Sequence, residues 1–163
     1  MPTCGRGKIE EVIVRLLTER KQTLALAESC TGGGIAHRLT NVPGASAVFL
    51  GGMVAYSNAA KQKFLGVRAE RLARHGAVSE AVARAMAEGA RKRFGADFAL
   101  AVTGIAGPTG GTKTKPVGTV FIALADAPET VVERRFNPGG REQFKDLTAQ
   151  QALEMLRARL IRD

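Results

Sequence analysis

A serine and a lysine lie in two separate segments whose surroundings suit catalysis. Ser29 follows a short apolar run and precedes the glycines at positions 32 to 34, which allow a ligand to approach the backbone closely. Lys61 lies about one turn into a helix that is predicted to begin near Ser57 or Asn58. A lysine that is desolvated loses its proton more easily and can then activate a serine hydroxyl as its base. The spacing alone favours a tight turn capped by Ser29 or Thr31, and a surface lysine at position 61.

A third segment, residues 103–108, follows a strongly apolar run and contains Thr103, Gly104 and Gly107. If that run is a buried strand, the Thr103 hydroxyl and the neighbouring amides should reach the same sheet edge as Ser29. The alternative is a loop that needs glycine for its backbone angles. Neither a P-loop nor a GxGxxG fingerprint is present.

Other reactive side chains offer weaker candidates. Cys30 is a rival nucleophile beside Ser29, although a buried cysteine is often part of the packing. His37 and His75 are expected to lie at the surface or to cap helices. No His, Cys or carboxylate cluster has the spacing of a metal site, so we expect no catalytic metal and no cofactor.

Helical and apolar segments alternate along the chain. Helices are predicted at about residues 6–20, from the glycines at 32–34 through Leu39, from Ser57 or Asn58 to Gly66, from Ser79 to Phe94, and after Gly139 and Gly140. Strands are predicted at about residues 23–27, 48–56, 98–102, 117–125 and 130–136. This alternation indicates an α/β fold with three layers, α/β/α, around a mostly parallel or mixed central sheet, formed by residues 1–163 as a single domain.

The composition excludes several classes of protein. The net charge is +9 and the pI is about 10.3, but the basic residues are spread along the chain and one tyrosine with no tryptophan offers few stacking platforms. The composition therefore argues against nucleic acid as a partner. The sequence has no apolar run long enough to cross a membrane, and its first eight residues lack the apolar stretch of a signal peptide. With only Cys4 and Cys30 and no paired spacing, we expect a cytoplasmic protein.

Taken together, the segments around these residues closely resemble the CinA carboxy-terminal-domain family, in order and spacing, from about residue 6 to the end. The matching stretches are residues 27–33, 56–61, 75–80, 103–108 and 115–120. The family's best-defined activity is that of a nicotinamide-nucleotide amidohydrolase, which converts nicotinamide mononucleotide and water to nicotinate mononucleotide and ammonia. The resemblance thus implies a metal-free hydrolase that uses a Ser–Lys dyad on a small pyridine nucleotide, without the extra amino-terminal domain of longer CinA proteins.

The resemblance also implies a role for each matching residue. Ser29 would be the nucleophile and Lys61 the base, with Tyr56 and Thr103 as hydrogen-bonding partners of this centre. Ser46 could orient Lys61 or be the nucleophile itself, and ranks below Ser29. The substrate would contact a set drawn from these segments and from three further positions, 46, 141 and 145: Cys30, Thr31, Gly32, Gly33, Ser46, Asn58, Gly104, Ile105, Ala106, Gly107, Arg141 and Lys145.

Three features of the sequence depart from the usual pattern of that family. Gly140 stands where related sequences carry aspartate, Lys145 stands where they often carry arginine, and Gly51-Gly52 replaces a bulkier, charged stretch. The first two bear on how the substrate's phosphate is held, for which Arg141 or Lys145 together with glycine-loop amides are the candidates. The family also implies a homo-oligomer. The alternative function is a non-catalytic nucleotide-binding or regulatory module of the competence and damage-inducible type.

Overall fold

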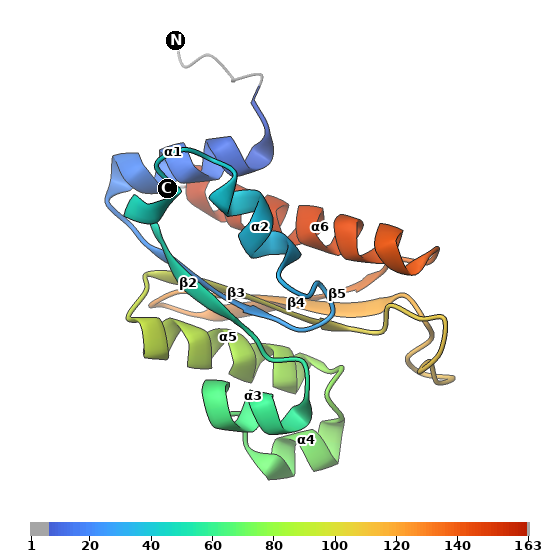
Figure 1. Ribbon diagram of the computed structural model, residues 1–163. Helices are drawn as coiled ribbons and strands as arrows, with labels where there is room; N and C mark the ends of the chain where they lie inside the picture. Colours follow the sequence, from blue (N-terminus) through green and yellow to red (C-terminus); the bar gives the residue numbers. More distant parts are fainter. Residues whose placement is uncertain (1–6, 163) are drawn as a thin grey trace.

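The computed structural model describes residues 7–162, and its centre is a five-stranded sheet (Figure 1). The strands lie in the order β2-β1-β3-β4-β5. Their bounds are β1 Leu24–Glu28, β2 Phe49–Val54, β3 Phe98–Gly104, β4 Thr119–Ala125 and β5 Thr130–Phe136. Each observed strand lies within about two residues of its predicted bounds. Cys4 and residue 6, where the first helix is predicted to begin, lie outside the described part of the chain.

The sheet is mixed, and its two halves differ in strand direction. β1 pairs in parallel with both β2 and β3, whereas β4 is antiparallel to β3 and to β5. The link between β4 and β5 spans only residues 126–129, which is too short for a crossover and therefore forces a hairpin. The predicted three-layer α/β fold is confirmed, and the sheet is the mixed rather than the mostly parallel form.

Helices cover both faces of the sheet (Figure 1). α1 (Ile9–Arg20), α2 (Gly34–Thr40) and α6 (Arg141–Ile161) lie on one face, and α3 (Asn58–Leu65), α4 (Ala69–His75) and α5 (Glu80–Phe94) lie on the other. A 3-10 turn, η1 (Ala45–Ala47), precedes β2. No helix in residues 7–162 combines the length and the apolar character needed to span a membrane.

Side-chain size alternates along the central strands and separates two cores. The strand residues that face α1, α2 and α6 include Leu24, Leu26 and Leu100, whereas those facing α5 are mainly alanines. Small residues on that face allow α5, which itself buries Ala83, Ala87 and Ala90, to pack close to the sheet. The alanine-rich face of the sheet thus allows close packing of α5, and α3 packs against α5 in the same layer.

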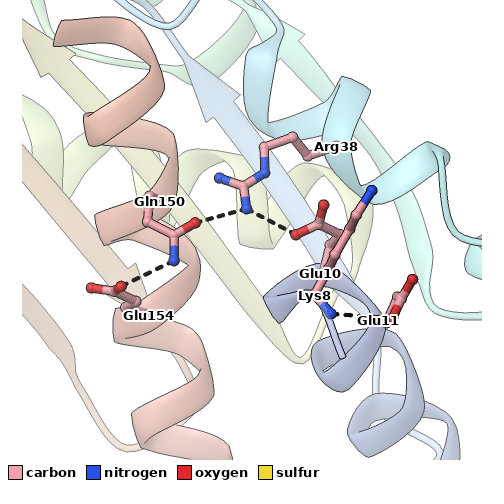
Figure 2. Close-up of polar contacts among 6 residues, drawn as sticks. All are labelled: Lys8, Glu10, Glu11, Arg38, Gln150 and Glu154. Atoms are coloured by element: carbon pink, nitrogen blue, oxygen red, sulfur yellow. Dashed lines mark hydrogen bonds and ion pairs between the residues drawn. The ribbon is translucent and has the colours of Figure 1, made fainter. Parts of the chain in front are cut away.

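A polar network ties the helices of the other face together. Arg38 of α2 donates to the Glu10 carboxylate of α1 at 2.8 Å and to the Gln150 side chain of α6 at 2.7 Å (Figure 2). Gln150 in turn donates to Glu154 at 3.0 Å. Because Arg38 reaches two neighbouring helices at once, it fixes α2 and the loop before it against α1 and α6.

The predicted helix ends on the opposite face are confirmed in detail. The Ser57 hydroxyl accepts from the Ala60 N–H, and the Ser79 hydroxyl accepts from the Val82 N–H, as N-cap residues do. Gly66 and Gly95 end α3 and α5 in the left-handed conformation, with φ of 70° and 63°. Helix α4 was not predicted, because its seven residues bury only Leu72 and show no clear apolar period.

Candidate active site

Several loops meet at the carboxyl-terminal edge of the parallel strands. Ser29 directly follows β1, Tyr56 lies two residues beyond β2, and Thr103 lies at the end of β3. β5 runs in the same direction as β3, so the chain after it brings Arg141, the first residue of α6, to the same edge. This is the edge at which open α/β sheets hold their ligands.

Ser29 and Lys61 are in hydrogen-bond contact at this edge. The Lys61 Nζ lies 3.0 Å from the Ser29 Oγ, and it also donates to the carbonyl oxygens of Ala55 at 2.9 Å and Tyr56 at 3.3 Å. The Lys61 residue is 1% exposed and Ser29 is 8% exposed. No carboxylate among the described residues forms an ion pair with Lys61.

These surroundings favour the neutral amine. Burial lowers the pKa of Lys61 below its ordinary value, because the charged form loses its hydration. A Cys30 thiolate would oppose this shift, but burial raises the pKa of the Cys30 thiol to about 12, so the thiol is uncharged near neutral pH. Lys61 also lies in the first turn of α3, where the helix dipole disfavours a cation.

Glu28 holds the Ser29 loop in place, a role that the sequence reasoning missed. Its buried carboxylate accepts from the Thr31 hydroxyl at 2.6 Å and from the N–H groups of Ile35 at 2.9 Å and Ala36 at 3.0 Å. The carboxylate thus satisfies the amino-terminal end of α2, which neither Ser29 nor Thr31 caps. An acidic residue immediately before a glycine-rich turn and a helix was the signal that could have identified it.

A pocket of about 280 Å³ contains the Ser29–Lys61 pair. Most of the predicted site residues line it: Ser29, Cys30, Tyr56, Asn58, Lys61, Thr103, Gly104, Ile105, Ala106, Gly107 and Arg141. Among the described residues, the N–H groups of Ala106 and Gly107 donate to no carbonyl or side chain. Both residues are buried and line the pocket, and a buried amide without a protein partner favours a ligand or water oxygen as its acceptor.

The remaining predicted binding residues lie elsewhere. Thr31, Gly32, Gly33 and Lys145 line a separate hollow of about 370 Å³, together with His37, Arg38 and Asp146. Ser46 is exposed on η1, next to the carbonyl of Val48 that pairs with the start of β1. It therefore lies at the opposite end of β1 from Ser29, and the structure does not bring it to Lys61.

Tyr56 and Thr103 have partners other than the expected ones. The Tyr56 phenol is 61% exposed and accepts from Arg141 Nη2 at 2.9 Å, while Arg141 Nη1 donates to the Gly107 carbonyl at 2.8 Å. The Thr103 hydroxyl donates to the Ala77 carbonyl at 2.9 Å. Both side chains line the pocket, but it is the backbone carbonyl of Tyr56 that contacts Lys61.

The weaker candidates occupy positions that fit structural roles. Cys30 is buried in the core beneath α2, and its high pKa keeps it from acting as a thiolate near neutral pH. His37 and His75 are exposed. Within residues 7–162, no group of three or more His, Cys, Asp or Glu side chains is placed to hold a metal ion.

Comparison with known proteins identifies the relatives of this chain. Residues 6–160 match the family model of the CinA C-terminal domain. A CinA-like protein of Parasynechococcus marenigrum is 54% identical over 155 residues, and one of Thermotoga maritima is 53% identical over 150 residues. These alignments cover 94% and 92% of this chain but 37% and 36% of the relatives, so the chain spans less than two-fifths of their length.

Solved structures agree over the whole domain. A competence-damaged protein (CinA) superfamily protein from Klebsiella pneumoniae is 36% identical with a TM-score of 0.91, covering 95% of this chain and 97% of that one. A competence/damage inducible protein from Agrobacterium tumefaciens is 44% identical with a TM-score of 0.87, covering 96% and 98%. Sequence and fold therefore agree that the chain belongs to the CinA C-terminal domain family.

Proposed function

We propose that this chain is an amidohydrolase that converts nicotinamide mononucleotide to nicotinate mononucleotide and ammonia. The observation that carries the proposal is the 3.0 Å contact between Ser29 Oγ and the buried Lys61 Nζ at the base of a pocket. A serine nucleophile needs a neighbouring base, and an amine buried beside the hydroxyl without a counter-charge can be that base. A site that only binds a ligand does not need such an amine. The substrate assignment rests on the resemblance of the motifs to the CinA carboxy-terminal-domain family.

In the first step Lys61 acts as the base. Its neutral amine has two N–H groups and one lone pair, and the carbonyls of Ala55 and Tyr56 accept from the two N–H groups. The lone pair is thereby directed to the Ser29 hydroxyl and takes its proton as Oγ bonds to the carboxamide carbon. The carbonyl π electrons move to oxygen, and the amides of Ala106 and Gly107 stabilise the resulting oxyanion.

In the second half of the reaction the same lysine acts as an acid. The Lys61 ammonium gives its proton to the carboxamide nitrogen, the C–N bond breaks, and ammonia leaves an ester on Ser29. A water molecule then gives a proton to Lys61 as it attacks the ester carbon. Collapse of this second tetrahedral species releases nicotinate mononucleotide, and the proton on Lys61 returns to Ser29 Oγ, so that the substrate and water are the only reactants consumed.

In this proposal the substrate's phosphate is assigned to Arg141. Its guanidinium lines the pocket, where Nη1 donates to the Gly107 carbonyl and Nη2 donates to the Tyr56 hydroxyl. The fork has five N–H groups, so donors remain for an anionic oxygen. Lys145 lies in the other hollow and does not share this pocket, so Arg141 is the phosphate ligand in this proposal.

The alternative is a module that binds a nucleotide without turnover. The names of the structural relatives, which refer to competence and damage induction, favour that reading and state no reaction. The two functions differ in one measurable respect: a binding module would take up nicotinamide mononucleotide in a calorimeter and release no ammonia.

The test is ammonia release from nicotinamide mononucleotide by the purified protein and its Ser29→Ala variant. We expect turnover by the wild type, unaffected by EDTA, and a loss of at least about 1,000-fold in the variant, as for nucleophile removal in other hydrolases. The variant should still bind the substrate, because only one oxygen is removed. Equal turnover by both proteins would exclude Ser29 as nucleophile, and a folded wild type that binds without turnover would establish the binding module instead.

A further inference from the structure

A further large hollow lies between the end of α3, the start of α4 and the second half of α5. Its volume is about 610 Å³. It is lined by Leu65, Gly66, Arg68, Arg71, Ala85, Glu88, Gly89, Lys92 and Arg93. None of these residues lines the pocket of Ser29 and Lys61, so the two sites are separate.

Positive charge is concentrated in this part of the fold. Apart from the buried Lys61, residues 58–95 contain eight of the 24 lysines and arginines but only three of the 15 acidic residues, and so carry five of the nine formal net positive charges. The charge that appears spread along the sequence is therefore gathered on the α3–α4–α5 layer. Four of these cations, Arg68, Arg71, Lys92 and Arg93, face one carboxylate, Glu88, around the hollow.

These four cations have no ion-pair partner within residues 7–162. The one hydrogen bond among their side chains runs from Arg71 Nη1 to the Ala81 carbonyl at 3.4 Å. Like charges held together repel one another and destabilise the folded state unless a counter-charge binds.

The floor of the hollow is backbone held at close range. A Cβ on Gly89 would lie 1.9 Å from the Leu65 carbonyl oxygen, so only glycine permits α5 to approach the end of α3 this closely. Gly66 adopts φ of 70°, and a Cβ there would lie 3.6 Å from Arg93 Nη2. The backbones of α3 and α5 thus line the hollow in tight contact at Gly89, and the Arg93 guanidinium lies beside Gly66.

We infer that this hollow binds a small, multiply charged anion that carries phosphate groups. Guanidinium groups match phosphate oxygens in paired hydrogen bonds, and four cations around one cavity require more than a single negative charge. The volume is that of a pocket for a small molecule. A nucleic-acid strand fits less well, because no aromatic side chain lines the hollow for base stacking and Glu88 would face the backbone phosphates.

The experiment is a titration with inorganic tripolyphosphate at constant ionic strength, by calorimetry and by thermal unfolding. We expect saturable binding of one anion per chain and a melting temperature that rises with its concentration. Arg68→Ala and Arg93→Ala, two exposed side chains outside the catalytic pocket, should each weaken binding about tenfold. Arg157→Ala is the matched control: it removes one exposed arginine from α6 and should leave the affinity unchanged.

Three outcomes would overturn the inference. The first is the absence of saturable binding to the wild type. The second is an equal loss of affinity in Arg157→Ala, which would show a general charge effect rather than a site. The third is binding of a single-stranded DNA oligonucleotide that is tighter than binding of tripolyphosphate and lost in Arg68→Ala, which would make the surface a polynucleotide site. None of these readouts depends on amidohydrolase activity.

Discussion

Two lysines flank the same glycine-rich loop after β1, and they differ in every property that matters for chemistry. Lys61 is 1% exposed and its Nζ contacts Ser29 and two backbone carbonyls. Lys145 is half-exposed, lines the separate hollow of about 370 Å³, and lies 3.5 Å from where a Cβ on Gly32 would be. The contrast shows that burial and partners, rather than residue type or nearness to the loop, distinguish a candidate base from a surface charge.

Replacing Lys61 tests this contrast with the largest expected effect. Lys61→Met should lower ammonia release by at least about 1,000-fold, because the Ser29 proton then has no acceptor. The same variant should unfold at a higher temperature near neutral pH, because it removes an amine whose burial is unfavourable. Activity within tenfold of the wild type, or a lower unfolding temperature, would contradict the assignment.

The pH dependence of this stability difference has a defined sign. The folded-state pKa of Lys61 is lowered, so between the folded and the unfolded pKa the unfolded chain binds more protons. Wild-type stability should therefore rise with pH across that interval, and the penalty should vanish above the unfolded pKa of about 10.4. Lys61→Met should lack this rise, which thermal unfolding of the two proteins at increasing pH would reveal.

Glu28 stabilises the glycine-rich loop that lies between the two lysines, because its carboxylate accepts hydrogen bonds from Thr31, Ile35 and Ala36. Glu28→Gln places an NH2 group among three donors, so it should lower kcat about 100-fold by displacing Ser29 and destabilise the fold by about 1–3 kcal/mol. KM should change little, since Glu28 does not line the pocket. A variant that loses stability but keeps the wild-type kcat would reduce Glu28 to a purely structural role.

The phosphate assignment distinguishes Arg141 from Lys145. Arg141→Ala should raise KM for nicotinamide mononucleotide about tenfold through loss of a charge-assisted contact, with a smaller effect on kcat. Steady-state kinetics with nicotinamide riboside, which lacks the phosphate, should show no such change. If KM for the riboside rises by the same factor in Arg141→Ala, Arg141 maintains the shape of the pocket and does not bind the phosphate.

Lys145→Met should have the smallest effect, within about threefold on kcat and KM, because its hollow is separate from the pocket of Ser29. It is the matched control for Lys61→Met, with the same change of side chain on the other side of the loop. A large increase in KM in Lys145→Met would show that the substrate contacts both hollows. Lys145 would then be part of the substrate site, which contradicts the contrast drawn between the two lysines.

Much of the fold could be predicted from local signals. Ser57, Gly66, Ser79 and Gly95 mark helix ends by chemistry that is visible in the sequence, and apolar runs mark the buried strands. Strand direction was less accessible, although the short link at residues 126–129 already implied a hairpin between β4 and β5. The concentration of basic residues on one helical layer could not be seen, because it depends on how α3, α4 and α5 pack.

The candidate site was predictable only in part. The strand pattern placed Ser29 and Thr103 at one sheet edge and Lys61 in the first turn of a helix, but the pattern of residues 58–65 gives no sign that Lys61 points inward. Its pairing with Ser29 came from the family resemblance. Which glycine-loop residues share the pocket also escaped prediction, since consecutive residues of one turn, Cys30 and Thr31, line different hollows.

The most direct test is an NMR titration of Lys61 Nζ in isotope-labelled protein, with the Lys61→Met variant to assign the signal, beside the pH profile of kcat/KM. We expect Lys61 to titrate below the ordinary lysine range, and the rise of kcat/KM with pH to follow the same pKa, because the neutral amine is the active form. A Lys61 signal that titrates at the ordinary lysine value, with activity already maximal while the amine is fully charged, would contradict its role as the base of Ser29.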